Sequence, residues 1–172
     1  MSLRCSVGSL GCLVAVALLA SAALGQSFPA GSGTFSGKGK LKVPGCDKVS
    51  APSSGSLYTL DANGVFTESD PGSDATIVGS AQPIGSNGRA FAISYAPGAL
   101  DELVPLIEEV SSLLCQSTFT LDSIQATSTL KLNKRLDRAK LRGRLTYAGN
   151  ALGVARTGRL KTKERGPWTT AP

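Results

Sequence analysis

Histidine is absent from the 172 residues of this chain. The absence removes the side chain that proteins use most often as a base near neutral pH and as a zinc ligand. A serine or cysteine nucleophile usually needs such a base beside it. Neither a G-x-S-x-G motif nor a phosphate-binding G-x-x-x-x-G-K sequence is present. We therefore expect a protein that is not an enzyme and holds neither a cofactor nor a metal ion.

Aromatic residues are also scarce, at 5% of the chain. Proteins that bind single-stranded nucleic acid interleave aromatic side chains with basic ones, because bases stack on aromatic rings. The basic segments near the C-terminus contain Tyr147, which alternation places on the face opposite to the basic residues. Nucleic acid is accordingly not an expected partner.

A long apolar run occurs at the N-terminus. Arg4 precedes an uncharged apolar stretch, Leu13 to Ala20, and Ala23 and Gly25 take the small-residue positions of a cleavage site. A membrane-spanning helix needs about 20 apolar residues, and Ser21 interrupts this run. The pattern predicts a signal peptide over 1–25 and one exported domain over 26–172, secreted or periplasmic, with no transmembrane anchor after cleavage.

Cleavage would leave two of the four cysteines, Cys46 and Cys115. A pair of cysteines in an exported chain is typical of a disulfide, whereas a zinc site would need more ligands and a catalytic thiol would need a base. The sequence predicts the bond Cys46–Cys115. Such a bond closes a loop of about 70 residues and would contribute about 4 kcal/mol by loop-closure entropy.

Most of the chain alternates apolar and polar residues, a period of two that is typical of antiparallel strands. A three-four spacing of leucine, isoleucine and valine predicts one helix over about 101–114. The sequence predicts a mainly β fold, an antiparallel barrel or sandwich of about eight or nine strands with loose ends. The expected strand regions are 34–43, the hairpins 56–69 and 75–95, and the segments 117–133, 139–149 and 151–163.

Charge is unevenly distributed. Residues 123–172 carry twelve Lys and Arg against two Asp and Glu, whereas residues 47–122 carry ten acids and two bases. In the last strands the cations share one face, and Lys38, Lys40 and Lys42 would extend that face if the first strand closes on the last. Such a face is either solvated surface or a contact for an anionic surface such as acidic polysaccharide or lipid headgroups. Its predicted residues are Lys131, Lys140, Arg142, Arg144, Arg159, Lys161 and Lys163.

Two arginines share the apolar parity of their strands. Arg156 alternates with Leu152, Val154 and Leu160, and Arg89 shares the parity of Phe91 and Tyr95. An arginine that points into a barrel needs a partner, and the anionic group of a ligand is one candidate, although a bulge would reverse the face. These four residues, Arg156, Arg89, Phe91 and Tyr95, form the predicted ligand site.

An acidic loop is a weaker candidate. Glu68, Asp70 and Asp74 lie close together in "ESDPGSD", but Asp-Pro-Gly is ordinary turn chemistry and matches no calcium-binding loop. We predict no metal there. The residues as a whole favour a binding protein whose barrel holds a small hydrophobic or amphiphilic molecule. The alternative is an envelope or matrix protein that contacts anionic surfaces through its basic C-terminal strands, and the oligomeric state stays open.

Overall fold

The structure is a computed structural model that describes residues 28–70 and 76–172. The predicted signal peptide and Asp74 lie outside the described residues. The strands are β1 (Gly31–Lys42), β2 (Lys48–Leu60), β3 (Val65–Ser69), β4 (Thr76–Pro83), β5 (Ala90–Tyr95), β6 (Phe119–Leu132), β7 (Arg138–Ala151), β8 (Val154–Pro167) and β9 (Thr169–Thr170). A 3-10 turn η1 (Asp101–Leu103) leads into the helix α2 (Val104–Cys115).

The first eight strands form a closed antiparallel barrel. Each strand pairs with its successor in the sequence from β1 to β8, and β8 pairs with β1 to close the ring. The short β9 adds to the N-terminal end of β1. Of the two predicted architectures the barrel is therefore the correct one, and its closure depends on the pairing of the first long strand with the last.

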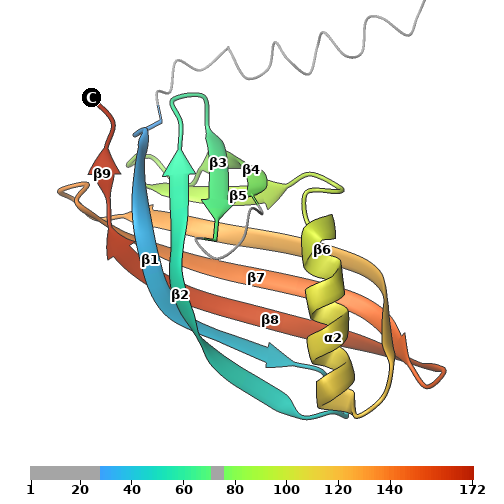
Figure 1. The fold of residues 1–172 in the computed structure, drawn as a ribbon. Helices are drawn as coiled ribbons and strands as arrows, with labels where there is room; N and C mark the ends of the chain where they lie inside the picture. Colours follow the sequence, from blue (N-terminus) through green and yellow to red (C-terminus); the bar gives the residue numbers. More distant parts are fainter. Residues whose placement is uncertain (1–27, 71–75) are drawn as a thin grey trace, which may run out of the picture.

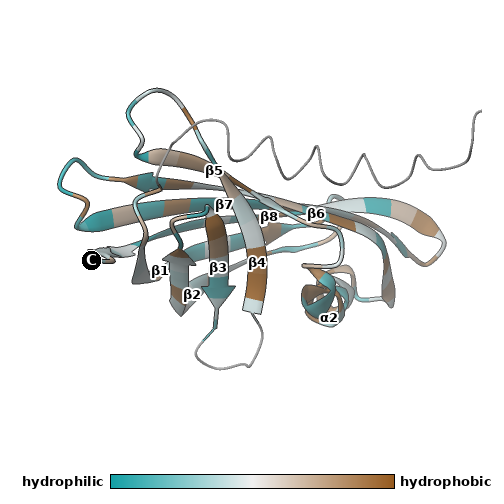
Figure 2. Cartoon of the chain, turned by 90° about the horizontal axis from the view of Figure 1, so that it is seen from above, coloured by the Kyte–Doolittle hydropathy of each residue, from teal (hydrophilic) through white to brown (hydrophobic). Residues whose placement is uncertain are grey.

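The strands are unequal, and this makes the two ends of the barrel different. β3 has 5 residues and β5 has 6, whereas β6, β7 and β8 have 14 each. β2 pairs with β3 only over Leu57–Leu60, so the short strands complete the wall at one end, which we call the upper end (Figure 1). At the lower end, where β1 ends and β2 begins, α2 covers the inner face of the long strands instead. Figure 2 shows α2 on the same side of the β6–β8 layer as β1–β4.

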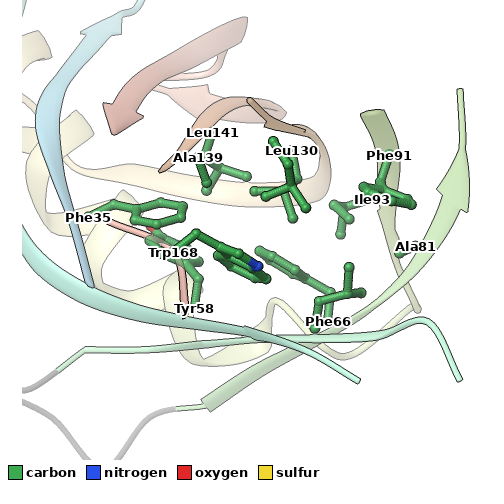
Figure 3. Close-up of a cluster of buried hydrophobic side chains, with 12 residues drawn as sticks. Phe35, Tyr58, Phe66, Ala81, Phe91, Ile93, Leu130, Ala139, Leu141 and Trp168 are labelled. Carbon is green, nitrogen blue, oxygen red and sulfur yellow. The ribbon is translucent and has the colours of Figure 1, made fainter. Parts of the chain in front are cut away.

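Two hydrophobic clusters fill the inside. The upper cluster is aromatic, with Phe35, Tyr58, Phe66, Phe91 and Trp168 among its buried members (Figure 3). The lower cluster lies under α2 and joins residues of the helix to the inner faces of β1, β6 and β7. Its buried members are Leu41, Val43, Ile107, Phe119, Leu145, Tyr147 and Ala151.

A row of small and polar residues separates the two clusters. Ser128, Gly143, Thr162 and Gly39 are register partners across β6, β7, β8 and β1. A Cβ atom on Gly143 would lie 2.4 Å from Thr162 Oγ1, so this position needs glycine if the wall is to keep its curvature. The interior therefore changes from apolar to polar and back along the barrel axis.

The predicted helix is confirmed. α2 follows η1 with Pro105 in its first turn, where a missing N–H is tolerated. The register of β6 against β7 shifts between Leu121 and Ser123, which indicates a bulge. The N–H of Leu121 donates to Glu108 Oε1 at 2.8 Å, so a carboxylate of the helix supplies an acceptor beside the bulge.

β2 begins earlier than the sequence indicates. Its first half, from Lys48, pairs with β1 although Pro52 interrupts the strand pattern. Proline lacks the N–H that a central strand needs and is tolerated on an edge. Because β2 meets β3 only from Leu57 onward, this half of β2 is an edge, and Pro52 is accommodated there.

The C-terminal segment is also more ordered than the expected loose end. Trp168 is 3% exposed, and its ring lies 6.2 Å from that of Phe35. The backbone N–H of Trp168 donates to the carbonyl of Asp137 at 2.9 Å, and β9 then pairs with β1 at Gly31 and Ser32. The buried indole explains why this segment is held in place.

The disulfide is confirmed. Cys46 lies in the turn between β1 and β2, Cys115 ends α2, and their sulfur atoms are bonded. The N–H of Asp47 also donates to the carbonyl of Leu114 at 3.1 Å. Two links thus hold the end of α2 against the β1–β2 turn at the lower end.

Candidate anionic-ligand site

Strand parity places a large set of cations on the outside of the barrel. Along β8, Leu160 and Glu164 face inward, whereas Arg159, Lys161 and Lys163 are exposed. The same alternation holds on β1 and β7. We define the cation face as twelve exposed outward cations of β1, β2, β6, β7 and β8, without Arg138 at the upper end of β7: Lys38, Lys40, Lys42, Lys48, Lys131, Lys140, Arg142, Arg144, Arg159, Lys161, Lys163 and Arg165.

The strand register brings these cations directly opposite one another. Three rows cross the strands as Lys48–Lys42–Arg159, Lys40–Lys161–Arg144 and Lys38–Lys163–Arg142. A fourth row is Arg165–Lys140–Lys131, on β8, β7 and β6. Within the described residues, no member of the cation face has a carboxylate as its register partner. Each row is therefore a line of three like charges.

Folding alone does not account for this arrangement. Like charges directly opposite each other on a sheet are destabilising. Lysine often protects a sheet edge from aggregation. Of the twelve cations only Lys48, on the first half of β2, stands on an edge. β8 and β7 are paired on both sides along the region that carries most of these cations. The rows thus weaken the isolated fold and provide a concentrated positive potential.

The cation face is hollowed. A groove of about 720 Å³ crosses β1, β8, β7 and β6 near the lower end, on the side opposite α2. Lys40, Lys42, Arg159 and Lys161 line one part of it. Neutral hydrogen-bonding side chains line the other part: Ser123, Gln125, Thr146 and Thr157. A smaller hollow of about 290 Å³ lies beside it, between Arg142, Arg144, Lys161 and Lys163.

All seven predicted contact residues belong to the cation face, and the expected extension by Lys38, Lys40 and Lys42 is present. Two members, Lys48 and Arg165, were not predicted. Arg165 has the parity of Lys161 and Lys163. It would have been identified if the alternation of β8 had been extended by two residues. Lys48 could have been predicted only if β2 were known to begin at residue 48, and Pro52 hides this early start in the sequence pattern. Whether this face binds an anionic partner is a matter for the proposal below.

The four residues of the predicted ligand site do not come together as one site. Arg89 precedes β5 at the upper end, whereas Arg156 follows the start of β8 at the lower end. Arg156 donates from a terminal guanidinium nitrogen to the carbonyl of Pro44 at 2.9 Å, which ties β8 to the β1–β2 turn. Phe91 is buried against Phe28, and the hydroxyl of Tyr95 donates to Ser128 Oγ at 3.1 Å.

Side chains that a hydrophobic ligand would contact are packed against one another. Phe35, Phe91, Ile93, Leu130 and Leu141 belong to the upper cluster. Leu41, Phe119 and Leu145 belong to the lower cluster, while Val154 is 52% exposed beyond the end of the wall. The interior residues thus satisfy each other's apolar surface, and the two grooves described above lie on the outside.

A buried carboxylate and a half-buried one form a feature that the sequence did not reveal. Glu164, on β8, is 7% exposed inside the barrel. Ser53 donates to its Oε1 at 2.6 Å, and the Tyr58 hydroxyl donates to its Oε2. The same Tyr58 oxygen lies 3.1 Å from Oε1 of Glu68 on β3. A hydroxyl has one proton to donate, so a proton on Glu68 supplies the second hydrogen bond.

The pKa of Glu68 agrees with this reading. Burial, together with the charges of Glu164 and Asp70, raises the pKa of Glu68 to about 7, although the hydrogen bond with Tyr58 acts in the opposite direction. Burial and the charges of Glu68 and Glu164 raise the pKa of the Tyr58 hydroxyl far above its usual range. Burial, with the same two carboxylates, raises the pKa of Tyr95 to about 12. These groups therefore form one proton-sharing polar layer inside the barrel.

These polar groups have a structural role inside the barrel. Glu164 is buried and its oxygens are occupied by Ser53 and Tyr58, which leaves no room for a substrate at the carboxylate. The calcium alternative for the acidic loop also loses Glu68, since this residue belongs to β3 and contacts Tyr58. No group of three metal-ligating side chains occurs in the described part of the chain.

No family model matches the chain, and no curated protein is similar to it at a significant level. Among residues 28–70 and 76–172, no helix is both long and apolar enough to cross a membrane.

Proposed function

We propose that this protein is an exported, non-enzymatic contact protein that binds anionic polymers or surfaces through the cation face. The observation that carries the proposal is the set of four cross-strand rows, in which like charges are direct register partners. A partner with phosphate, sulfate or carboxylate groups would convert these repulsions into attractions.

The groove supports a partner that has both anionic and hydroxyl groups. Its cationic part, with Lys40 and Lys161, suits a charged group. Its neutral part, with Gln125 and Thr146, offers amide and hydroxyl groups that can exchange hydrogen bonds with sugar or glycerol hydroxyls. Export is supported by the apolar N-terminal run together with the Cys46–Cys115 bond, since disulfides persist in oxidising compartments.

The hydrophobic-ligand hypothesis receives less support. A carrier needs an internal space of about 300 Å³ or more for a small molecule. The inward apolar side chains are divided between two packed clusters with a polar layer between them. We therefore favour the outer face over the interior.

Reversal of one complete row tests the proposal. The triple variant Lys40→Glu, Arg144→Glu and Lys161→Glu should lower affinity for soluble polygalacturonate or dextran sulfate about a hundredfold, since three charge contacts are removed and three repulsions are added. Binding of the wild type should weaken steeply with salt. Titration calorimetry or interferometry at two salt concentrations measures both effects, with uncharged dextran as the ligand control.

A matched variant separates the face from net charge. Lys134 and Arg135 lie in the β6–β7 turn, and Arg138 is the first residue of β7 at the upper end, outside the four rows. Their reversal to glutamate changes the net charge equally but leaves all four rows intact. This control should retain most of the affinity. Equal loss in the two variants, or no polyanion binding by the wild type, would contradict the proposal.

A further inference from the structure

The turn between β7 and β8 has a residue that its conformation disfavours. Leu152 and Gly153 join the two strands, with φ of 52° and 77°. Positive φ at both central residues is the pattern of a type I′ hairpin turn, which favours asparagine, aspartate or glycine at the first position. A leucine with positive φ is strained, because its side chain crowds the backbone. The turn is therefore less stable than an Asn-Gly turn at the same place would be.

The strained leucine also gains nothing by burial. Leu152 is 84% exposed, and Val154 on the other side of the turn is 52% exposed. The hairpin projects beyond the rest of the fold at the lower right of Figure 1. Leu113, on the last turn of α2, is 71% exposed at the same lower end. Strain and apolar exposure at one projecting tip indicate a role outside the fold.

The strands that lead to this tip carry many cations, and the exposed acid Asp122 lies on the neighbouring strand β6. The β7–β8 hairpin, residues 138–167, carries nine Lys and Arg, and its one acid is the buried Glu164. The row of the cation face nearest the tip, Lys48–Lys42–Arg159, lies at the lower end, with Asp47 as an exposed acid beside it. Arg159 is five residues from Val154, about 16 Å along an extended strand.

We propose that the lower end docks on an anionic lipid bilayer, with the Leu152–Val154 tip inserted at the boundary of headgroups and acyl chains. This inference rests on the proposed function and names the surface that the cation face meets. Interfacial anchors enter about 5–10 Å. A tip at that depth leaves Arg159 and Lys42 within about one Debye length of the phosphates, where each cation adds to the attraction.

The apolar tip and the nearby charge suit lipid better than a protein partner. A protein interface usually covers a broad patch of side chains with an apolar centre. Here two apolar side chains stand at the end of a narrow hairpin, and basic residues follow on the same strands. Such a combination of a small apolar anchor and a basic surface gives stable membrane attachment when neither alone is sufficient.

Leu152→Asn tests the proposal with a variant that should not harm the fold. Asparagine suits the positive φ, so the melting temperature should stay equal or rise. Affinity for phosphatidylglycerol-containing vesicles should fall about tenfold or more, the loss expected when one leucine no longer leaves water. Vesicle flotation of the mature protein exported by its own host measures the affinity. Affinity for soluble polygalacturonate should not change.

Leu106→Asn is the matched control. Leu106 is 56% exposed near the start of α2, away from the lower end, so its replacement should leave vesicle binding unchanged. A second variant, Leu152→Trp, should show a blue-shifted emission on anionic vesicles and quenching by brominated acyl chains. Native Trp168 is buried in the upper cluster and gives a constant background.

The two proposals fail in different ways. Wild-type protein that binds polygalacturonate but not anionic vesicles would overturn the bilayer inference and leave the cation face intact as a polyanion site. Equal vesicle binding by wild type and Leu152→Asn would also overturn it. If the wild type bound neither polygalacturonate nor anionic vesicles, the proposed function itself would be contradicted.

Discussion

The charged side chains on the two faces of β8 have opposite kinds of neighbour. On the inner face, Glu164 receives hydrogen bonds from Ser53 and Tyr58, so the chain itself stabilises the buried charge. On the outer face, Lys161 and Lys163 stand one residue away, and their register partners are further cations. A buried charge without partners would prevent folding, whereas exposed like charges cost much less because water screens them. The inner charge therefore serves the fold, and the outer charges are available for a partner.

Tyr58→Phe should have the largest effect on stability, because it removes the hydroxyl that joins Glu68 to Glu164. The ring would keep its contacts with Phe35 and Phe66, so the loss is polar. We expect a decrease of about 3 kcal/mol in the free energy of unfolding at about pH 8, where Glu68 is ionised and the Tyr58 hydroxyl no longer donates to the carboxylate pair. Urea denaturation at several pH values measures it, and the decrease should be smaller in acid.

Tyr147→Phe is the control for this prediction. The Tyr147 hydroxyl is also buried, but it shares a hydrogen bond of 2.7 Å with Ser111, a neutral partner. Its loss should cost about 1 kcal/mol. That cost should not depend on pH between 5 and 8. If both variants lose the same stability at every pH, the carboxylate pair contributes no charge-dependent stability.

Glu68→Gln should change how stability depends on pH. The pKa of Glu68 is about 7 in the folded protein and 4.5 in the unfolded chain, so the folded state binds the proton more tightly. The contribution of Glu68 to stability is then fully present below about pH 4.5, falls as the pH rises, and is lost above about pH 7. We expect the fall to be about 2 kcal/mol, since Glu68 keeps some solvent contact. Glutamine can donate to Tyr58 at every pH. The free energy of unfolding of the variant should therefore depend less on pH, and it should be higher than that of the wild type at pH 8.

Chemical denaturation of wild type and Glu68→Gln across this pH range measures how steeply the free energy of unfolding of each protein changes with pH. Parallel curves would show that the carboxyl of Glu68 titrates normally. A wild-type curve that rises from pH 5 to 7 would reverse the assigned direction of the pKa shift.

The barrel and the cation face could be predicted because both depend on alternation along single strands. Leu141, Leu145 and Tyr147 fix which side of β7 is buried, and Arg142 and Arg144 must then lie outside. The register partners of the cations needed one further assumption, the pairing of the first strand with the last. That closure is confirmed, and it explains why this part of the prediction agrees with the structure.

The inner polar layer could not be predicted because its members are distant in the chain. Tyr58 and Glu164 are 106 residues apart, and alternation shows only that each faces inward. Their contact depends on how β2, β1 and β8 curve around the axis. Arg89 and Arg156 failed as a joint site for the same reason: parity gave both an inward direction but did not give their heights in the barrel.

The smallest effect expected on stability comes from the outer face. Lys161→Glu places a carboxylate between Lys40 and Arg144, so two like-charge contacts become attractive. We expect the free energy of unfolding to rise by about 0.5 to 1 kcal/mol at low salt and by less at high salt. The control Lys134→Glu lies in the β6–β7 turn, outside the rows, and should show little change.

Polyanion affinity should move in the opposite direction in Lys161→Glu, because the same residue lines the groove. A residue whose replacement improves folding but weakens binding is retained for binding, since folding alone selects against it. Thermal melts and polygalacturonate titrations on the same samples decide between the two roles. If Lys161→Glu leaves affinity unchanged, the rows of cations are only solvated surface, and the difference between the two faces of β8 reflects burial alone.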